Sequence, residues 1–346
     1  MPRSPQNEPE GAPPQRAIHV IVLDGTLSSL EPASRTNAGQ AYGLLKETRS
    51  ALSLYYEPGL QWTHWRSIWD VIAGRGINRQ IRRAYGWLSA RYRPGDRIFL
   101  LGYSRGAYAV RSLAGVMNMV GLLRPNHSTK EAVRTAYRHY ETNPASAEAR
   151  AFSAAYCHQG VEIDTIAIWD TVKSLGLNAP VLWRLSRKVH GFHNHELGAD
   201  VLHGYHALAH DETRVAYAPV LWTTPEGYSG RVEQVWFPGT HGDVGGHLGG
   251  FEAARPLANI PLVWMLSKLE ARGLPLPPGW QDRFVQDPLA PSQGTFRGYG
   301  KLLVTRRRRR IGLDPSERLH VSLHSRSQAL GTRLGHHAGP YVQSTS

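Results

Sequence analysis

The chain has 346 residues, a hydrophobic fraction of 41% and a formal net charge of +13. These values predict a globular protein of one large domain or two small ones, and they argue against a disordered or fibrous chain. The single cysteine, Cys157, excludes an internal disulfide, and we expect it to be a small thiol in the core. The excess of positive charge favours acidic partners, such as an anionic membrane surface.

The two ends of the chain differ from its middle in composition. Residues 1–16 are rich in proline and polar side chains and lack the apolar run of a signal peptide, so we expect a disordered tail. No stretch approaches the roughly 18 apolar residues of a membrane span. We therefore expect a cytoplasmic protein, or one exported without a cleaved signal peptide, that is not integral to a membrane. Residues 17–330 are expected to form one domain, and 331–346 a flexible tail.

Strand and helix patterns alternate through the domain. This alternation predicts an α/β fold with a mostly parallel central sheet and helices on both faces. Residues 173–230 show little strand pattern, and we interpret them as an insertion or lid-like region over the strand C-terminal ends. The expected strands cover residues 17–25, 51–56, 97–104, 161–170, 231–239 and 319–324, and the expected helices cover 36–49, 77–92, 107–123, 129–141, 145–157 and 253–272.

The segment GYSRG at 102–106 matches the G-x-S-x-G pattern of a nucleophile elbow. An apolar strand precedes it and a helix follows it, which is the context that the elbow requires. We expect Ser104 to be a nucleophile at the helix N-terminus, with the Arg105 N–H donating to an oxyanion. A second donor is expected from Gly25 or Thr26, in the turn after the first strand. An ordinary N-cap serine is the structural alternative.

A serine nucleophile needs a base, and the base needs an acid that orients it. In α/β-hydrolases these groups follow the serine in the order acid, then histidine, each after a later strand. Asp170 follows the strand at 161–170, and His241 follows the strand at 231–239, so we expect them to complete a triad with Ser104. Asp243 and His320 are the alternative acid and base.

Other features carry weaker predictions. The arginine run at 306–310 is expected to be a solvated loop or a patch over acidic lipid, and no nucleic-acid motif accompanies it. The segment Asp24-Gly25-Thr26 is similar to the start of a phosphatase motif, but Val22 stands where that motif has its nucleophilic aspartate. The histidines lack a metal-ligand spacing, so no metal or cofactor is expected; those that lie close together in the sequence are His193, His195, His203, His206 and His210.

Six blocks in order resemble one family: DGT at 24–26, YEPG at 56–59, RPGDRIFLLGYSRGAYAVRSLAG at 93–115, IAIWDTVKSLG at 166–176, YHALAHDETR at 205–214 and VWFPGTHGDVGGH at 235–247. The chain is similar to the Tle1-like α/β-hydrolase domains whose best understood members are phospholipase effectors of bacterial type VI secretion. That resemblance implies a triad of Ser104, Asp170 and His241, esterase activity on phospholipids, and a secretion or immunity partner. Two positions depart from the family pattern: Leu23 replaces an aromatic residue, and His247 replaces a glycine.

These observations together predict a carboxylic-ester hydrolase, acting on lipid or phospholipid acyl esters through an acyl-enzyme. Two other classes remain open at this point. One is a hydrolase-like binding module without catalysis. The other is a basic nucleic-acid-binding protein, for which the arginine run is the sole support and which we do not expect.

Overall fold

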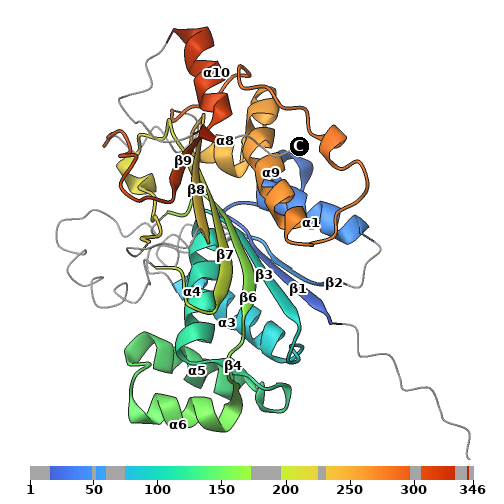
Figure 1. The fold of residues 1–346 in the computed structure, drawn as a ribbon, viewed down its shortest axis with the longest axis vertical. Helices are drawn as coiled ribbons and strands as arrows, with labels where there is room; N and C mark the ends of the chain where they lie inside the picture. Colours follow the sequence, from blue (N-terminus) through green and yellow to red (C-terminus); the bar gives the residue numbers. More distant parts are fainter. Residues whose placement is uncertain are drawn as a thin grey trace, which may run out of the picture.

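The computed structural model describes residues 16–48, 52–59, 75–172, 196–224, 231–296, 305–331 and 341–342. An eight-stranded sheet crosses the molecule (Figure 1), and all neighbouring strands in it pair in parallel. The order across the sheet is β10-β9-β8-β7-β6-β3-β1-β2. These strands are β1 (Ile18–Leu23), β2 (Leu52–Glu57), β3 (Arg97–Tyr103), β6 (Ile163–Trp169), β7 (Val201–Ala209), β8 (Val232–Phe237), β9 (Glu317–His320) and β10 (Tyr341–Val342).

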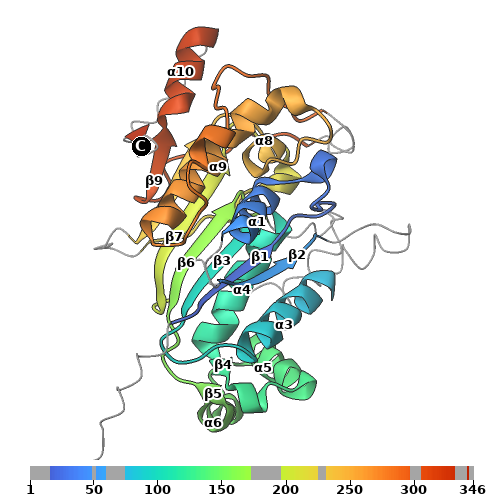
Figure 2. The ribbon, with the colours of Figure 1, turned by 90° about the vertical axis from the view of Figure 1, so that its right-hand side faces the viewer.

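Helices cover both faces of this sheet, as Figure 2 shows. Helices α1 and α9 pack on one face, and α3 and α4 pack on the other. A short antiparallel pair, β4 (Leu122–Leu123) and β5 (Cys157–His158), lies with α5 and α6 at the lower end of Figure 1. The helices are α1 (Asn37–Glu47), α3 (Arg75–Ser89), α4 (Arg105–Met119), α5 (Lys130–Thr142), α6 (Ala147–Tyr156), α8 (His241–Gly245), α9 (Arg255–Ala271) and α10 (Val321–Leu330).

The side chains of β1 alternate between two hydrophobic clusters, one on each face of the sheet. Val20 and Val22 belong to the cluster that contains α1 and α9, whereas Ile21 and Leu23 belong to the cluster that contains α3 and α4. Successive side chains of a strand point to opposite faces, so a strand covered on both sides is mainly apolar. This arrangement confirms the predicted α/β fold. Cys157 is a buried free thiol, also as predicted.

The interpretation of 173–230 as one insertion is wrong for the strand at its centre. β7 lies inside the sheet between β6 and β8, and most of its residues are buried. The other parts of that prediction, 173–195 and 225–230, lie outside the described residues. Two histidines and a glycine interrupt the apolar run of β7, which is why its pattern does not indicate a strand.

Two predictions at the C-terminal end also need correction. The strand expected at 319–324 ends at His320, where helix α10 begins, and the His320 side chain caps that helix by accepting from Ser322 N. The tail expected at 331–346 contributes β10, which pairs with β9 at the sheet edge. None of the helices that the structure describes combines the length and apolar character that a membrane span requires.

Candidate active site

Ser104 lies between β3 and α4, at a sharp turn near the middle of the sheet. Its backbone has φ +56° and ψ −118°, a strained conformation for a residue with a side chain. The chain can turn this tightly because Gly106 passes against β1: a Cβ at Gly106 would lie 2.0 Å from the Leu23 carbonyl oxygen. The turn places the hydroxyl just ahead of the first residue of a 15-residue helix.

His241 joins the Ser104 hydroxyl to a buried carboxylate. Its Nε2 lies 2.8 Å from Ser104 Oγ, and its Nδ1 lies 2.6 Å from Asp170 Oδ2. An ionised carboxylate only accepts hydrogen bonds, so Nδ1 carries the proton and Nε2 is free to accept the hydroxyl proton. The ring is held between Tyr217, stacked at 4.8 Å, and Tyr103, at 5.0 Å. The geometry can therefore raise the nucleophilicity of the serine.

Asp170 follows β6 directly and also has a positive φ, of +41°. It is fully buried, and the Ala209 N–H donates to its Oδ1 at 3.0 Å. The Arg309 guanidinium forms two further hydrogen bonds, 2.5 Å to Oδ1 and 2.8 Å to Oδ2. Burial alone would raise the pKa of Asp170, but the Arg309 charge and the hydrogen bonds from His241 and Arg309 outweigh it. They hold the pKa of this carboxyl well below its usual range.

Arg309 is the residue of this site that the sequence analysis missed. The run at 306–310 was expected to be solvated, yet the Arg309 side chain is only 4% exposed. It also donates to the backbone carbonyls of Ala209, at 2.9 Å, and Tyr217, at 2.6 Å. Its neighbours Arg307, Arg308 and Arg310 are exposed, as the prediction had it. Five adjacent arginines offer no sequence signal that distinguishes the buried member.

The turn after β1 approaches the same serine. A Cβ at Gly25 would lie 3.3 Å from the Ser104 Cβ, so this backbone borders the nucleophile. The Gly25 N–H, however, donates to the Asp24 carboxylate at 2.7 Å, which removes it as an oxyanion donor. The expectation of Gly25 as a donor is therefore wrong. Thr26 N–H and Arg105 N–H have no acceptor among the described residues and stay available.

The alternative acid and base lie apart from this site. Asp243 caps α8: its Oδ2 accepts from Thr240 N at 2.7 Å, and its Oδ1 accepts from Gln293 N at 2.8 Å. His320 stacks on Phe237 at 4.6 Å, and burial lowers its pKa to about 4. Neither side chain contacts Ser104, so the structure brings together the first three predicted residues and not these two.

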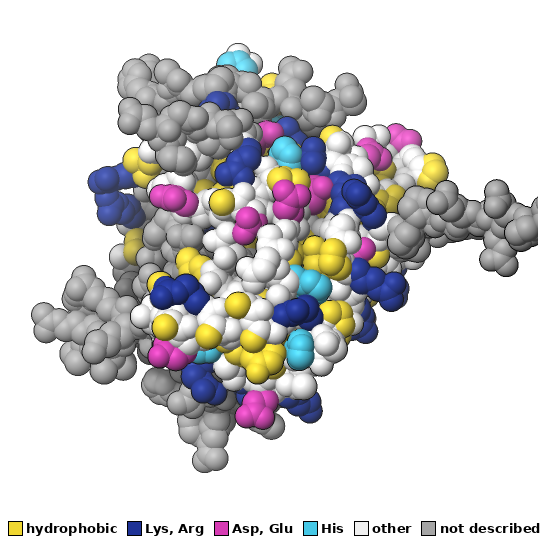
Figure 3. Space-filling model, turned by 60° about the horizontal axis from the view of Figure 1, so that its bottom comes forward, with side chains coloured by type: hydrophobic (Ala, Val, Ile, Leu, Met, Phe, Trp, Pro, Cys, Tyr) yellow, Lys and Arg dark blue, Asp and Glu magenta, His cyan; other side chains and the backbone are white. Residues whose placement is uncertain are grey.

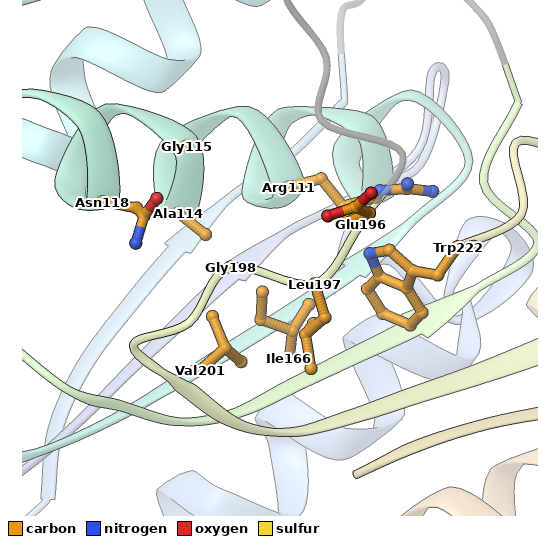
Figure 4. Close-up of a pocket in the computed structure, with 10 residues that line it drawn as sticks. All are labelled: Arg111, Ala114, Gly115, Asn118, Ile166, Glu196, Leu197, Gly198, Val201 and Trp222. Carbon is orange, nitrogen blue, oxygen red and sulfur yellow. The ribbon is translucent and has the colours of Figure 1, made fainter. Parts of the chain in front are cut away.

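A small cavity beside α4 does not belong to this site. It has a volume of about 20 Å³, enough for a water-sized guest, and Figure 4 shows it between the C-terminal half of α4 and strands β6 and β7. Its lining includes Arg111, Ile166 and Trp222.

The described residues contain no group of three or more side chains able to hold a metal ion. His206, within β7, accepts from Thr171 N at 3.2 Å, and burial lowers its pKa to about 3.

Fold and site together define an α/β-hydrolase-fold protein with a serine, a histidine and an aspartate in one hydrogen-bonded series. The family model for the catalytic domain of Tle1-like phospholipase effectors of type VI secretion matches residues 18–268. The chain therefore belongs to that family, which confirms the resemblance found in its sequence blocks.

Three individual proteins that resemble this chain share at most about a quarter of their aligned residues with it. The uncharacterized protein YEL023C of Saccharomyces cerevisiae is 27% identical over 231 residues, which cover 59% of this chain and 32% of that protein. The chain thus spans about a third of the length of this curated relative. Similar solved structures include an uncharacterized protein from Pseudomonas aeruginosa, with 16% identity and a TM-score of 0.43 over 79% of this chain and 48% of that one. Another is the Tle1 effector bound to the VgrG spike, with 18% identity and a TM-score of 0.30 over 67% of this chain and 51% of that one.

Proposed function

We propose that this protein is a serine esterase that cleaves carboxylic esters of lipids, including the acyl esters of phospholipids. The single observation that supports the reaction type is the hydrogen-bonded series Ser104–His241–Asp170, with distances of 2.8 and 2.6 Å. Membership in a phospholipase effector family supports the lipid substrate. The same membership supports delivery of the protein by a secretion partner.

In the proposed reaction His241 Nε2 takes the Ser104 proton as the Oγ attacks the acyl carbon. Asp170 holds the imidazole in the correct tautomer and stabilises its charged form. The N–H groups of Arg105 and Thr26 donate to the oxyanion, one from the start of α4 and one from the turn after β1. The imidazolium then protonates the leaving alcohol. Water attacks the acyl-enzyme, with His241 again as the base, and releases the fatty acid.

A fluorophosphonate probe and a panel of acyl esters test this proposal. We expect the wild type to be labelled and to hydrolyse the esters, and we expect Ser104→Ala to lose both properties. Asp170→Asn should lower kcat by about 10³- to 10⁴-fold, since the imidazole loses the tautomer that accepts the serine proton. Absence of labelling in a folded wild type would instead indicate a binding module without catalysis.

His320→Gln separates the two candidate bases. This variant leaves all contacts of Ser104 intact, so we expect kcat close to that of the wild type, with lower thermal stability because the cap of α10 is weakened. His241→Gln should abolish hydrolysis while the protein stays folded. The opposite pattern, an inactive His320→Gln and an active His241→Gln, would overturn the assignment of the base.

A further inference from the structure

Arg105 carries a buried positive charge that has no partner among the residues that the structure describes. Its side chain follows the nucleophile directly, and the residue is only 8% exposed. No hydrogen bond or ion pair joins its guanidinium to any residue that the structure describes, and Nη1 is fully buried without a partner. Burial lowers the pKa of Arg105 to about 10, so the group keeps its charge near neutral pH.

A second buried arginine on the same helix shows what a structural role looks like. Arg111 donates to the carbonyls of Val220 and Leu221 and lies over the Trp222 ring, 4.9 Å from its centroid. Figure 4 shows its side chain beside Trp222. Burial lowers the pKa of Arg111 to about 10 as well. In the described part of the chain, Arg111 therefore has carbonyl acceptors and Arg105 has none, although burial lowers the pKa of both side chains.

The position of Arg105 connects it with the site. The Tyr217 side chain lies close enough to act on the pKa of Arg105, and the Tyr217 ring stacks on His241 at 4.8 Å. Arg105 is also the first residue of α4, where unpaired N–H groups and the helix dipole favour a negative charge. The residue that follows the nucleophile thus combines a buried cation with a helix N-terminus.

We propose that the Arg105 guanidinium is an anion-binding subsite that receives a phosphate group carried by the ester substrate. This inference rests on the proposed esterase function and makes it more specific. A guanidinium presents a planar pair of donors that matches two phosphate oxygens, and in a buried site such charged hydrogen bonds are strong. The subsite would favour acyl esters with a phosphate near the scissile bond over neutral glycerides.

The test compares two short-chain substrates that differ in the headgroup, dihexanoyl phosphatidic acid and dihexanoylglycerol. The wild type should prefer the phosphate ester in kcat/KM. Arg105→Met should reduce that preference by about tenfold to a hundredfold, the value of a hydrogen bond to a charged group. Arg105→Lys should restore part of it. The control Arg134→Met removes one exposed charge from α5 and should keep the wild-type preference. An unchanged preference in Arg105→Met would overturn the subsite.

A free phosphate ion can occupy the same subsite, so inorganic phosphate forms the second arm. With dihexanoylglycerol as substrate, phosphate should inhibit the wild type and not Arg105→Met. A preference for the lipid phosphate without inhibition by the free ion assigns the subsite to the headgroup, and equal inhibition of both proteins contradicts the subsite. If the wild type cleaves neither ester and resists the fluorophosphonate probe, the proposed function itself fails.

Stability provides a readout that does not depend on activity. Replacing an unpaired buried charge by an apolar side chain of similar size stabilises a protein, whereas breaking a satisfied contact destabilises it. The unfolding midpoint of Arg105→Met should therefore rise, and that of Arg111→Met should fall. A fall in Arg105→Met similar to that in Arg111→Met would show that Arg105 has a structural partner, and the subsite would be rejected.

Discussion

At the scale of single residues, the most informative contact is the one between Arg309 and Asp170. An aspartate that orients a histidine has to stay ionised, although complete burial favours its protonated form. The fold meets this need with a cation that donates to both carboxylate oxygens and is itself tied to the carbonyls of Ala209 and Tyr217. In the proposed reaction, Arg309 is therefore a positioning residue that acts through Asp170.

Arg309→Met tests this role. Without the cation the pKa of Asp170 should rise, because burial is no longer outweighed. The carboxylate is then protonated at higher pH on acidification, so the acidic limb of the pH–activity profile should move to higher pH. Loss of one partner of a buried ion pair should also cost about 3–5 kcal/mol of unfolding free energy.

Arg308→Met is the matched control, since Arg308 belongs to the same run and is exposed. It should keep both the pH profile and the stability of the wild type. If Arg309→Met loses stability while its acidic limb stays in place, the arginine supports the fold and not the ionisation of Asp170.

At the scale of elements, the elbow depends on close contact between α4 and β1. Gly106→Ala would place a methyl group 2.0 Å from the Leu23 carbonyl oxygen, so strand or helix must shift. We expect a loss of about 1–3 kcal/mol in unfolding free energy, as for overpacked cores, together with slower fluorophosphonate labelling of Ser104. Gly43→Ala is the control within α1: no atom lies within 4 Å of the added Cβ, and stability should rise by about 0.5–1 kcal/mol. Similar stability in both variants would contradict the tight approach.

The turn after β1 contains a buried acid with the opposite behaviour to Asp170. Burial raises the pKa of Asp24 to about 6, despite hydrogen bonds from Thr36, Gly25 and Tyr56. The folded state thus binds a proton that the unfolded chain has already released. The stabilising contribution of this proton is complete below pH 4 and is lost as the pH rises through about 6.

We therefore expect the unfolding free energy of the wild type, measured relative to Asp24→Asn, to fall by about 3 kcal/mol between pH 4 and pH 7. Denaturant titrations at several pH values measure this difference. Asp96 provides the comparison: burial would raise its pKa, but hydrogen bonds from Arg93 N, His19 and Ala17 N outweigh burial and lower it. Relative to Asp96→Asn, the stability of the wild type should rise with pH from the acid side. A flat difference for Asp24→Asn would show that its carboxyl keeps an ordinary pKa.

Elements whose side chains follow one pattern could be predicted from the sequence. The strands that end in Leu23, Tyr103 and Trp169 consist mainly of apolar residues, and each was predicted within a few residues. β7 was missed because His206 interrupts its apolar pattern. The ring can be buried because both of its nitrogens have hydrogen-bond partners in other segments, the Thr171 N–H and the Gln234 side chain. A pattern within one segment contains no information about such partners.

The same limit explains which parts of the site could be predicted. Ser104, Asp170 and His241 each follow a strand, so chain order alone brings them to one edge of the sheet. Arg309 reaches that edge from a loop whose position depends on backbone hydrogen bonds with the segment around Thr213 and Val215. Its contact with Asp170 is a property of the folded chain and has no counterpart in local sequence.

At the scale of the whole molecule, the basic side chains that give the formal charge of +13 are not distributed evenly over the surface. On the face that includes the lower end of Figure 1, Figure 3 shows basic side chains interspersed with acidic and apolar ones. Arg307, Arg308 and Arg310, by contrast, are exposed on either side of the arginine that binds Asp170. These three exposed positive charges flank Arg309 and can attract an anionic lipid surface toward the site. This is the role that the sequence analysis expected for a patch over acidic lipid.

The triple variant Arg307→Gln, Arg308→Gln, Arg310→Gln tests this surface. Each arginine near an anionic bilayer contributes about 1 kcal/mol, so affinity for vesicles rich in anionic lipid should fall roughly a hundredfold, as measured by co-sedimentation at low salt. The salt dependence of the remaining binding should also weaken, because fewer charges are screened. Hydrolysis of a soluble ester should be retained.

A second triple variant decides whether position or net charge matters. Arg79→Gln, Arg134→Gln, Arg138→Gln removes the same charge from exposed positions on α3 and α5. If the arginines beside Asp170 form the membrane-facing surface, this variant should bind anionic vesicles nearly as well as the wild type. Equal losses in both variants would mean that long-range attraction by the total charge accounts for the binding. The orientation of the site toward the bilayer would then have no basis in the arginine run.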